Sequence, residues 1–386
     1  MISPSVSRSF AWLRPLLVGV VGLGTGFAQS PETKEFVEWG RETMTMIDSG
    51  YWMRGRNLYS EDSVREGDTY KPGRQPAFMW GCGVMLSALA MASHMEPSLY
   101  EDRMLAYTEA LKSYWSFSSG IRGYDVLPRM ERADRYYDDN AWMVLAFLEV
   151  YQHTRDRKFL KHAEEIMEFV LSGEDDKLGG GLYWRELEKE SKNTCTNAPA
   201  ITGLLMLYGL TKQEKYMEAA QRLYPWTCKN LQDPEDGLFW DHIKLNGEVD
   251  KRKFSYNSAL MIRANCLIYQ ITKREKYLDE AKRIGHAAIR HWVKPDGAIA
   301  DGAAFGHLLL GSFVQLARLD KDPVWRDTVF KCVRYVHDKV RNADGRYGDR
   351  WDRPTGSSPE RFKLLDEASV ARAYWEAAVL ASQGSR

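Results

Sequence analysis

Residues 136–142 read Tyr-Tyr-Asp-Asp-Asn-Ala-Trp, and they stand where a loop full of charge becomes an apolar run with helical periodicity. This apolar run, residues 139–153, is followed by a helical run with a charged face that begins at Lys158. A helix that is apolar nearly all round is surrounded by protein, whereas a helix with one charged face borders solvent. The stretch therefore predicts an inner helix joined to an outer one.

The same pair of runs recurs along the chain. The first run with a charged face begins at Lys34. Each later run of this kind contains an aromatic residue, and these residues recur about every 60 positions, at 100, 159, 216, 277 and 325. Between them lie less charged helical runs, at residues 76–93, 139–153, 197–211, 257–272, 306–319 and 366–382. Six such hairpins predict an all-α fold, an (α/α)6 toroid whose apolar helices form the inner ring. A two-domain helical bundle is the alternative, but no Ser/Gly/Pro-rich linker interrupts the repeat, so we expect one domain over residues 29–386.

The connections from outer to inner helices carry a second repeat. Several contain an Asp-Gly or Gly-Gly turn followed by apolar or aromatic residues, at 178–184, 235–240, 295–299 and 344–348. This pattern is typical of a turn with a short hairpin strand. Because all these loops join an outer helix to the next inner one, we expect them at one rim, with Tyr136, Tyr137, Tyr183, Trp184 and Trp240 lining a cleft there. Turn chemistry alone explains Asp236, Asp296 and Asp344.

The N-terminal residues indicate where the protein is located, and the composition restricts the classes of molecule that it can bind. Arg8 and Arg14 precede the apolar run 16–23, and small residues at Gly26 and Ala28 suit a signal peptidase, so residues 1–28 are predicted to be a signal peptide. We expect an exported protein, periplasmic or extracellular, whose mature chain is monomeric and has no membrane span. The formal net charge of +0, without a basic stripe, argues against a nucleic-acid partner.

Cysteine and histidine usage predicts neither a metal site nor a cofactor. The 5 cysteines form no C-x-x-C pair and mostly fall within apolar helical runs, so we expect buried free thiols. The 8 histidines show no metal-ligand spacing.

Two interpretations of Asp138 and Asp139 are open from the residues alone. Asp138 could cap the helix that begins near Asp139, because an N-cap aspartate accepts a backbone N–H and acids suit a first turn. Alternatively, repulsion and burial push the pKa values of two adjacent carboxyl groups apart, which leaves one ionised and one protonated near neutral pH. Retaining glycoside cleavage requires such a pair, about 5 Å apart. Adjacent helical positions point about 100° apart, so the carboxyl groups can lie on either side of a sugar.

Four motifs, taken in order, resemble those of glycoside hydrolase family 76, the endo-α-1,6-mannanases. They are Tyr-Asp-Asp-Asn-Ala-Trp at 137–142, Gly-Gly-Gly-Leu-Tyr-Trp at 179–184, Lys-Asn-Thr-Cys-Thr-Asn at 192–197, and Tyr-Asn at 256–257. The resemblance extends over roughly residues 34 to 382 and implies an (α/α)6 fold and cleavage with retention of configuration. It also implies that Asp138 is the nucleophile and Asp139 the acid/base.

The resemblance also suggests substrate-binding residues. Asparagines of the motifs could hydrogen-bond to sugar hydroxyls and aromatic residues could stack on a pyranose ring, which gives the set Tyr137, Asn140, Trp184, Asn193, Asn197, Trp240, Tyr256 and Asn257. The chain departs from the family at Ser258-Ala259, where Gln-Gly is usual, and at residues 78–80, where paired tryptophans are usual. We expect both changes near sugar subsites.

Other activities fit the same fold. A mannosyl transglycosidase would use the same two aspartates, and a non-catalytic glycan-binding protein could retain the scaffold. An unsaturated glucuronyl hydrolase would favour basic residues at the rim, and a sugar epimerase would rely on paired histidines, for which His242 and His307 are candidates by analogy of fold alone.

Overall fold

The computed structural model describes residues 30–129, 134–357 and 359–383. The predicted signal peptide, residues 1–28, lies outside the described residues. Twelve α-helices make up most of the described chain, with short strands between some of them.

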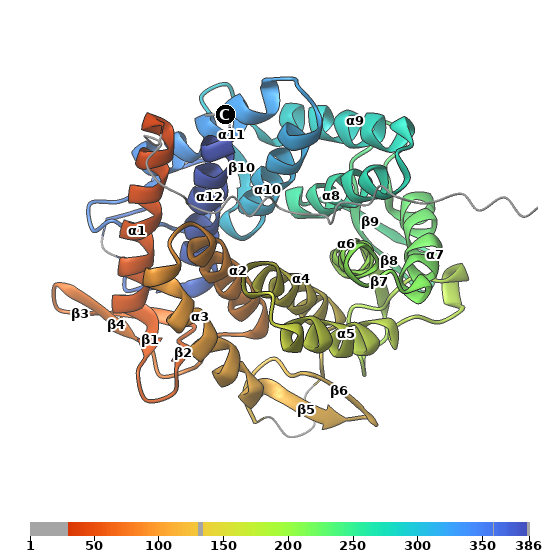
Figure 1. Ribbon diagram of the computed structural model, residues 1–386, viewed down its shortest axis with the longest axis horizontal. Coiled ribbons are helices and arrows are strands. Elements are labelled where there is room, and N and C mark those ends of the chain that lie inside the picture. The colour runs from red at the N-terminus through yellow and green to blue at the C-terminus, as the bar shows by residue number, and fades with distance from the viewer. Residues whose placement is uncertain (1–29, 130–133, 358, 384–386) are drawn as a thin grey trace, which may run out of the picture.

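The less charged runs form an inner ring of six helices (Figure 1). These are α2 (Met79–Met95), α4 (Tyr137–Thr154), α6 (Thr194–Thr211), α8 (Ser255–Thr272), α10 (Ala303–Leu319) and α12 (Leu364–Gln383). Each packs on the next, and α12 packs on α2, which closes the ring. Burial follows the prediction, since every residue from 140 to 150 of α4 is buried.

The runs with a charged face form the outer helices. These are α1 (Pro31–Tyr51), α3 (Pro97–Ala110), α5 (Arg157–Leu171), α7 (Glu214–Leu231), α9 (Glu275–Trp292) and α11 (Val324–Tyr335). Each packs on an inner helix through one apolar stripe, as α5 does on α4 with Phe159, Ala163, Ile166 and Val170. The predicted (α/α)6 toroid is therefore confirmed.

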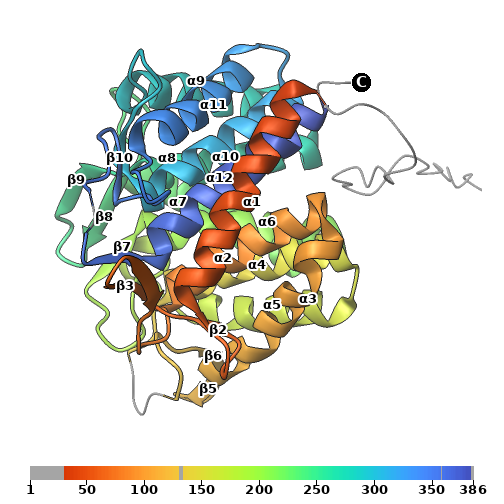
Figure 2. The same ribbon diagram turned by 90° about the vertical axis from the view of Figure 1, so that its left-hand side faces the viewer.

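All strands lie in the loops that run from an outer to an inner helix, at one rim of the toroid (Figure 2). They are β1 (Trp52–Met53), β2 (Leu58–Tyr59), β3 (Asp62–Glu66), β4 (Thr69–Pro72), β5 (Trp115–Ser118), β6 (Ile121–Tyr124), β7 (Ser191–Asn193), β8 (Trp240–Lys244), β9 (Val249–Lys253), β10 (Ile299–Gly302), β11 (Arg350–Trp351) and β12 (Arg361–Lys363). Antiparallel pairing joins β12 to β3, β7 to β8, and β10 to β11. Neighbouring loops are thus hydrogen-bonded to one another, which was not predicted from the sequence.

The Asp-Gly turns have the structural role that was expected of them. Gly237 and Gly297 have φ angles of +80° and +101°, a region that disfavours side chains. The Asp236 and Asp296 carboxylates accept the N–H groups of Leu238 and Ala298 two residues on, as in an Asx turn.

The opposite rim has tight turns and buried charges. The Glu149 carboxylate on α4 accepts a hydrogen bond of 2.9 Å from Arg372 on α12, and Arg372 also bonds to Glu376 at 3.1 Å. Arg263 on α8 adds a longer contact of 3.5 Å to Glu149. A cavity of about 70 Å³ adjoins these residues and Arg318. Within the described residues, no helix is long and apolar enough to cross a membrane.

We predict that Glu149→Ala lowers the free energy of unfolding by about 3–5 kcal/mol, because it leaves the buried Arg263 without its carboxylate and Arg372 with Glu376 alone. Only 2% of the Glu149 side chain and 6% of the Arg372 side chain are exposed. Denaturant unfolding measures the change. Glu109→Ala is the control, since Glu109 pairs with Lys112 on the surface, where a pair contributes at most about 1 kcal/mol. Equal stability of the two variants would contradict the prediction.

Candidate active site

The rim end of α4 is fixed by the loops on either side of it. The Tyr137 N–H donates to the Trp184 carbonyl at 2.9 Å. Just before the helix, Arg135 is fully buried, and its guanidinium bonds to both carboxylate oxygens of Glu186 at 2.8 Å. The same guanidinium donates to the Ser118 and Ile121 carbonyls of the β5–β6 hairpin. Asp138 and Asp139 therefore project from a firmly held first turn.

Asp138 accepts three hydrogen bonds. Its Oδ1 accepts the N–H of Asp139 at 2.9 Å. Its Oδ2 accepts the indole N–H of Trp184 at 2.9 Å and the thiol of Cys195, with a separation of 3.5 Å from Sγ. Trp184 belongs to the loop before β7 and Cys195 to α6, so three segments of the chain meet at this carboxylate.

Asp139 has a different environment. Among the described residues, its carboxyl group has no hydrogen-bond partner, and its charge acts on the buried Cys82 of α2. Asp138 contacts the α6 side, as the 100° step between adjacent helical positions predicts. The two carboxyl groups therefore face different neighbours.

This difference separates the pKa values of the pair. Burial raises the pKa of Asp138 to about 6, while the hydrogen bonds from Trp184, the Asp139 N–H and Cys195 limit the rise. Burial, and then the charge of Asp138, raises the pKa of Asp139 well above its usual range. Asp138 therefore loses its proton at a lower pH than Asp139 does.

Asp138 is not the N-cap of α4. The helix begins at Tyr137 and Tyr136 occupies the N-cap, with extended backbone and no capping side chain. Asp138 is the second residue of the helix and bonds to the N–H of the residue that follows it. An acid in the first turn still suits the helix dipole, but the capping interpretation is wrong.

Asn140 and Asn197 bind backbone, and the expectation that they bind substrate is wrong. The Asn140 amide accepts the Tyr124 N–H and donates to the Tyr124 and Tyr136 carbonyls. The Asn197 amide accepts the Leu182 N–H and donates to the Leu182 and Asn193 carbonyls. These bonds use every polar atom of both side chains, and both residues are fully buried.

The same bond recurs at the fourth residue of other inner helices. Ser258, fourth in α8, accepts the Phe239 N–H, and Glu367, fourth in α12, accepts the Tyr347 N–H. Each of these residues, Asn140, Asn197, Ser258 and Glu367, thus connects its helix by a hydrogen bond to the rim loop that precedes it. Ser258 was expected near a sugar subsite, but it is fully buried and makes one of these helix-to-loop hydrogen bonds.

Tyr137 and Trp240 both turn away from Asp138, and the burial of Tyr137 contradicts its prediction as a sugar-stacking residue. Tyr137 is 2% exposed and stacks on Phe169 of the outer helix α5. Trp240 donates its indole N–H to Asp233 and lines a surface hollow with His291 of the outer helix α9. Side chains alternate along a strand, and the next residue of β8, Asp241, is the one whose charge reaches Cys195.

Tyr256 lies in an aromatic cluster that the sequence did not assign to the site. Its ring stacks on Phe305 of α10 at 4.5 Å, with Trp142 at 6.3 Å and Trp80 at 6.2 Å. These residues come from the first two turns of α8, α10, α4 and α2, so the cluster crosses the ring beside the aspartate pair. The sequence signal that could have identified this cluster is an aromatic residue near the start of an inner helix.

The remaining predicted residues are mostly enclosed. Asn193, 6% exposed, accepts a bond from Ser191. Asn257 is fully buried, and neither atom of its amide has a partner among the described residues. His307 is also fully buried on α10, and the predicted pairing of His242 with it at the rim is not observed.

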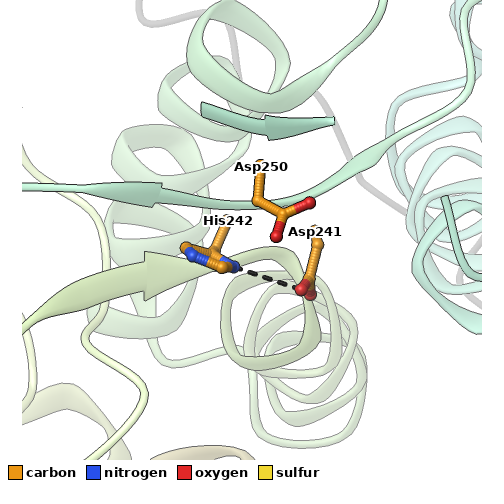
Figure 3. A group of neighbouring side chains, drawn as sticks. All are labelled: Asp241, His242 and Asp250. Atoms are coloured by element: carbon orange, nitrogen blue, oxygen red, sulfur yellow. Dashed lines mark hydrogen bonds and ion pairs between the residues drawn. The ribbon is translucent and has the colours of Figure 1, made fainter. Parts of the chain in front are cut away.

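Asp241, His242 and Asp250 form a group on the β8–β9 hairpin that could hold a metal ion (Figure 3). One ligand atom from each lies within 4.8 Å of the others. However, Asp241 already bonds to His242 at 3.1 Å, and the Arg252 guanidinium contacts both carboxylates, at 2.8 Å for Asp250 and 3.4 Å for Asp241. The guanidinium already occupies an oxygen of each carboxylate, and we assign no metal to this group.

The 5 cysteines are free thiols, as expected; four are buried and Cys228 is half-buried. The contact between Cys195 and Asp138 could not be inferred from the sequence, because it joins the first turns of two inner helices.

Comparison with known proteins agrees with the fold. A family model described as glycosyl hydrolase family 76 matches residues 53–335. An α-mannanase of this family from Bacteroides thetaiotaomicron is 32% identical and covers 89% of this chain and 95% of its own, with a TM-score of 0.83. A family 76 mannosidase from the same organism is 24% identical and covers 91% of this chain and 100% of its own, with a TM-score of 0.82.

A third structure is an inactive variant of an α-1,6-mannanase from Salegentibacter sp. HEL1_6, with two consecutively numbered aspartates changed to asparagine, in complex with α-1,6-mannotriose. It is 23% identical, with a TM-score of 0.76, and covers 89% of this chain and 99% of its own. The two likenesses below 25% identity show the fold alone. No curated relative matches the chain.

Proposed function

Because this chain belongs to glycosyl hydrolase family 76, we propose that it hydrolyses α-1,6-mannosidic linkages of mannan with retention of configuration. The observation that carries the proposal is the aspartate pair at the rim end of α4. Asp138 is the member whose pKa is about 6, and the pKa of Asp139 lies well above its usual range. Retaining cleavage requires one ionised and one protonated carboxyl group.

In the first step, an oxygen of ionised Asp138 attacks the anomeric carbon of an α-mannosyl residue. The glycosidic C–O bond breaks, and Asp139 donates its proton to the departing O6. The product of this step is a β-mannosyl ester of Asp138. In the second step, Asp139 takes a proton from water, the water oxygen bonds to the anomeric carbon, and the ester bond to Asp138 breaks. Two inversions restore the α configuration.

The aromatic cluster of Trp80, Trp142, Tyr256 and Phe305 supplies a surface for a pyranose face beside the pair. This assignment replaces Tyr137 and Trp240. Export of the protein remains our proposal from the sequence of residues 1–28.

We predict that the mature protein, residues 29–386, releases short oligosaccharides from linear α-1,6-mannan, and a parallel digestion of α-1,2-branched mannan measures its tolerance of branches. Product sizing over time distinguishes internal from terminal cleavage, and NMR of the first-formed product reports its anomeric configuration. A β-configured first product would contradict the retaining mechanism. Activity on unsaturated uronates and none on mannan would overturn the proposal.

The same digestion separates the other candidates. Addition of a manno-oligosaccharide acceptor lengthens the products of a transglycosidase, which uses the same two aspartates. A non-catalytic protein binds mannan without releasing reducing ends. Burial of His307 argues against an epimerase with a histidine pair at the rim.

A further inference from the structure

The Asp138 carboxylate is held by side chains from outside its own helix. Trp184 and Cys195 both donate to Oδ2, at 2.9 Å and 3.5 Å, and among the described residues only the Asp139 N–H donates to Oδ1. A carboxylate offers about four lone-pair sites, two on each oxygen. The three donors therefore saturate Oδ2 and leave one lone pair on Oδ1.

Both side-chain donors are themselves fixed. The Trp184 backbone is bonded on both sides, since its N–H donates to Ser191 and its carbonyl accepts from Tyr137. Its ring meets the Tyr136 ring edge-on at 5.2 Å. Cys195 is 5% exposed in the first turn of α6, and its thiol also interacts with the Tyr256 hydroxyl. These contacts hold both donors in position before a substrate binds.

We propose that Trp184 and Cys195 are positioning residues: together they hold Oδ2 of Asp138, keep the carboxyl group ionised, and leave Oδ1 as the atom that attacks the anomeric carbon. The inference rests on the proposed function, because it assigns the attacking atom of the proposed nucleophile. It also changes the role of Trp184, which the sequence suggested as a sugar-stacking residue.

The physical reason is the environment of the pair. Burial alone favours the protonated form of Asp138, which cannot act as a nucleophile. Hydrogen bonds to the charged form oppose this effect, and bonds to an ionised group are the stronger class. The indole N–H is a full donor, whereas a thiol is a weak one, so Trp184 should contribute more than Cys195.

The test is a pH titration of Asp138, monitored by carbon-13 NMR of selectively labelled aspartate carboxyl groups. Asp138→Asn identifies the signal. Trp184→Phe keeps the ring and removes the donor, and we expect the pKa of Asp138 to rise by about 1 to 2. Cys195→Ala should raise it by less, and Cys195→Ser, which supplies a stronger donor, should lower it. The opposite directions of the two cysteine variants keep the test valid if Trp184→Phe does not fold.

Trp325→Phe is the matched control. The Trp325 indole also donates to a carboxylate Oδ2 at 2.9 Å, that of Asp320, next to an outer helix. Its removal breaks an equivalent bond elsewhere and should leave the Asp138 titration unchanged. The acidic limb of kcat/KM against pH should shift with the NMR pKa in the Trp184 and Cys195 variants.

Failure of this inference is distinguishable from failure of the proposed function. The carboxyl titration needs no turnover, so a shifted pKa in a protein that does not act on mannan supports the hydrogen-bonding role and rejects the function. Active protein whose Asp138 titrates alike in wild type, Trp184→Phe and both cysteine variants overturns the inference. A loss of rate in these variants with an unchanged pH profile also overturns it.

Discussion

We expect Asp138→Asn to abolish the proposed turnover of mannan and to leave the fold intact. Loss of a covalent nucleophile can lower kcat on the order of 10⁶-fold, because no glycosyl-enzyme ester can form. The amide has the same shape as the carboxylate, and its oxygen can still accept the Trp184 indole N–H. Reducing-end release measures the activity, and circular dichroism with a thermal melt measures the fold. Full activity of this variant would remove Asp138 from the role.

Asp296→Asn provides the control for this substitution. Asp296 lies in a rim turn, where its carboxylate accepts only the Ala298 N–H, and an asparagine oxygen can accept the same bond. We expect wild-type activity from this variant. A similar loss in both variants would mean that the assay reports damage to the rim rather than loss of a nucleophile.

Asp139→Ala lowers kcat on mannan by about 10² to 10⁴-fold, the range for loss of a general acid/base. A substrate with a fluoride leaving group, such as α-1,6-mannobiosyl fluoride, needs no proton for departure, so formation of the ester on Asp138 should be much less affected. Added azide should then react with the ester and yield an α-mannosyl azide. Kinetics on both substrates and NMR of the azide product check these outcomes.

The pH profile gives a second check on Asp139. This residue must be protonated, so the wild-type rate falls when the pH rises through its pKa, which lies well above the usual range. Asp139→Ala should lose this alkaline fall and keep the acidic limb, since ionisation of Asp138, with a pKa of about 6, is still required. Equal losses on mannan and on the fluoride, with no azide product, would exclude the acid/base role.

The sequence motifs located the site more reliably than they assigned its residues. Residues 136–142 placed both aspartates at the start of an inner helix, and the structure agrees. Asn140 and Asn197 in the same motifs looked like ligands for sugar hydroxyls, yet they bind the backbone of the rim loops. A motif indicates that a residue type is needed at a position. It does not tell whether the amide of an asparagine hydrogen-bonds to loop backbone or to a sugar hydroxyl, because the same group can do either.

Trp184 and Trp240 illustrate the same limit. Both follow a rim turn, and their local sequences are similar. One indole donates to Asp138 and the other to Asp233, because the two tryptophans lie on opposite sides of their rim segments. Orientation depends on strand register, and pairing of β7 with β8 sets that register through contacts between residues about 50 positions apart.

The sequence by itself determined the toroid, because six alternating pairs of apolar and amphipathic helices without a linker bury their surfaces as two concentric layers. It also determined the adjacency of Asp138 and Asp139. The family resemblance implied their roles, but only the tertiary structure supplied the physical reason why their pKa values differ. Their local sequence surroundings are nearly the same, and the difference comes from Trp184 and Cys195, which distant loops and helices bring to one carboxylate and not to the other.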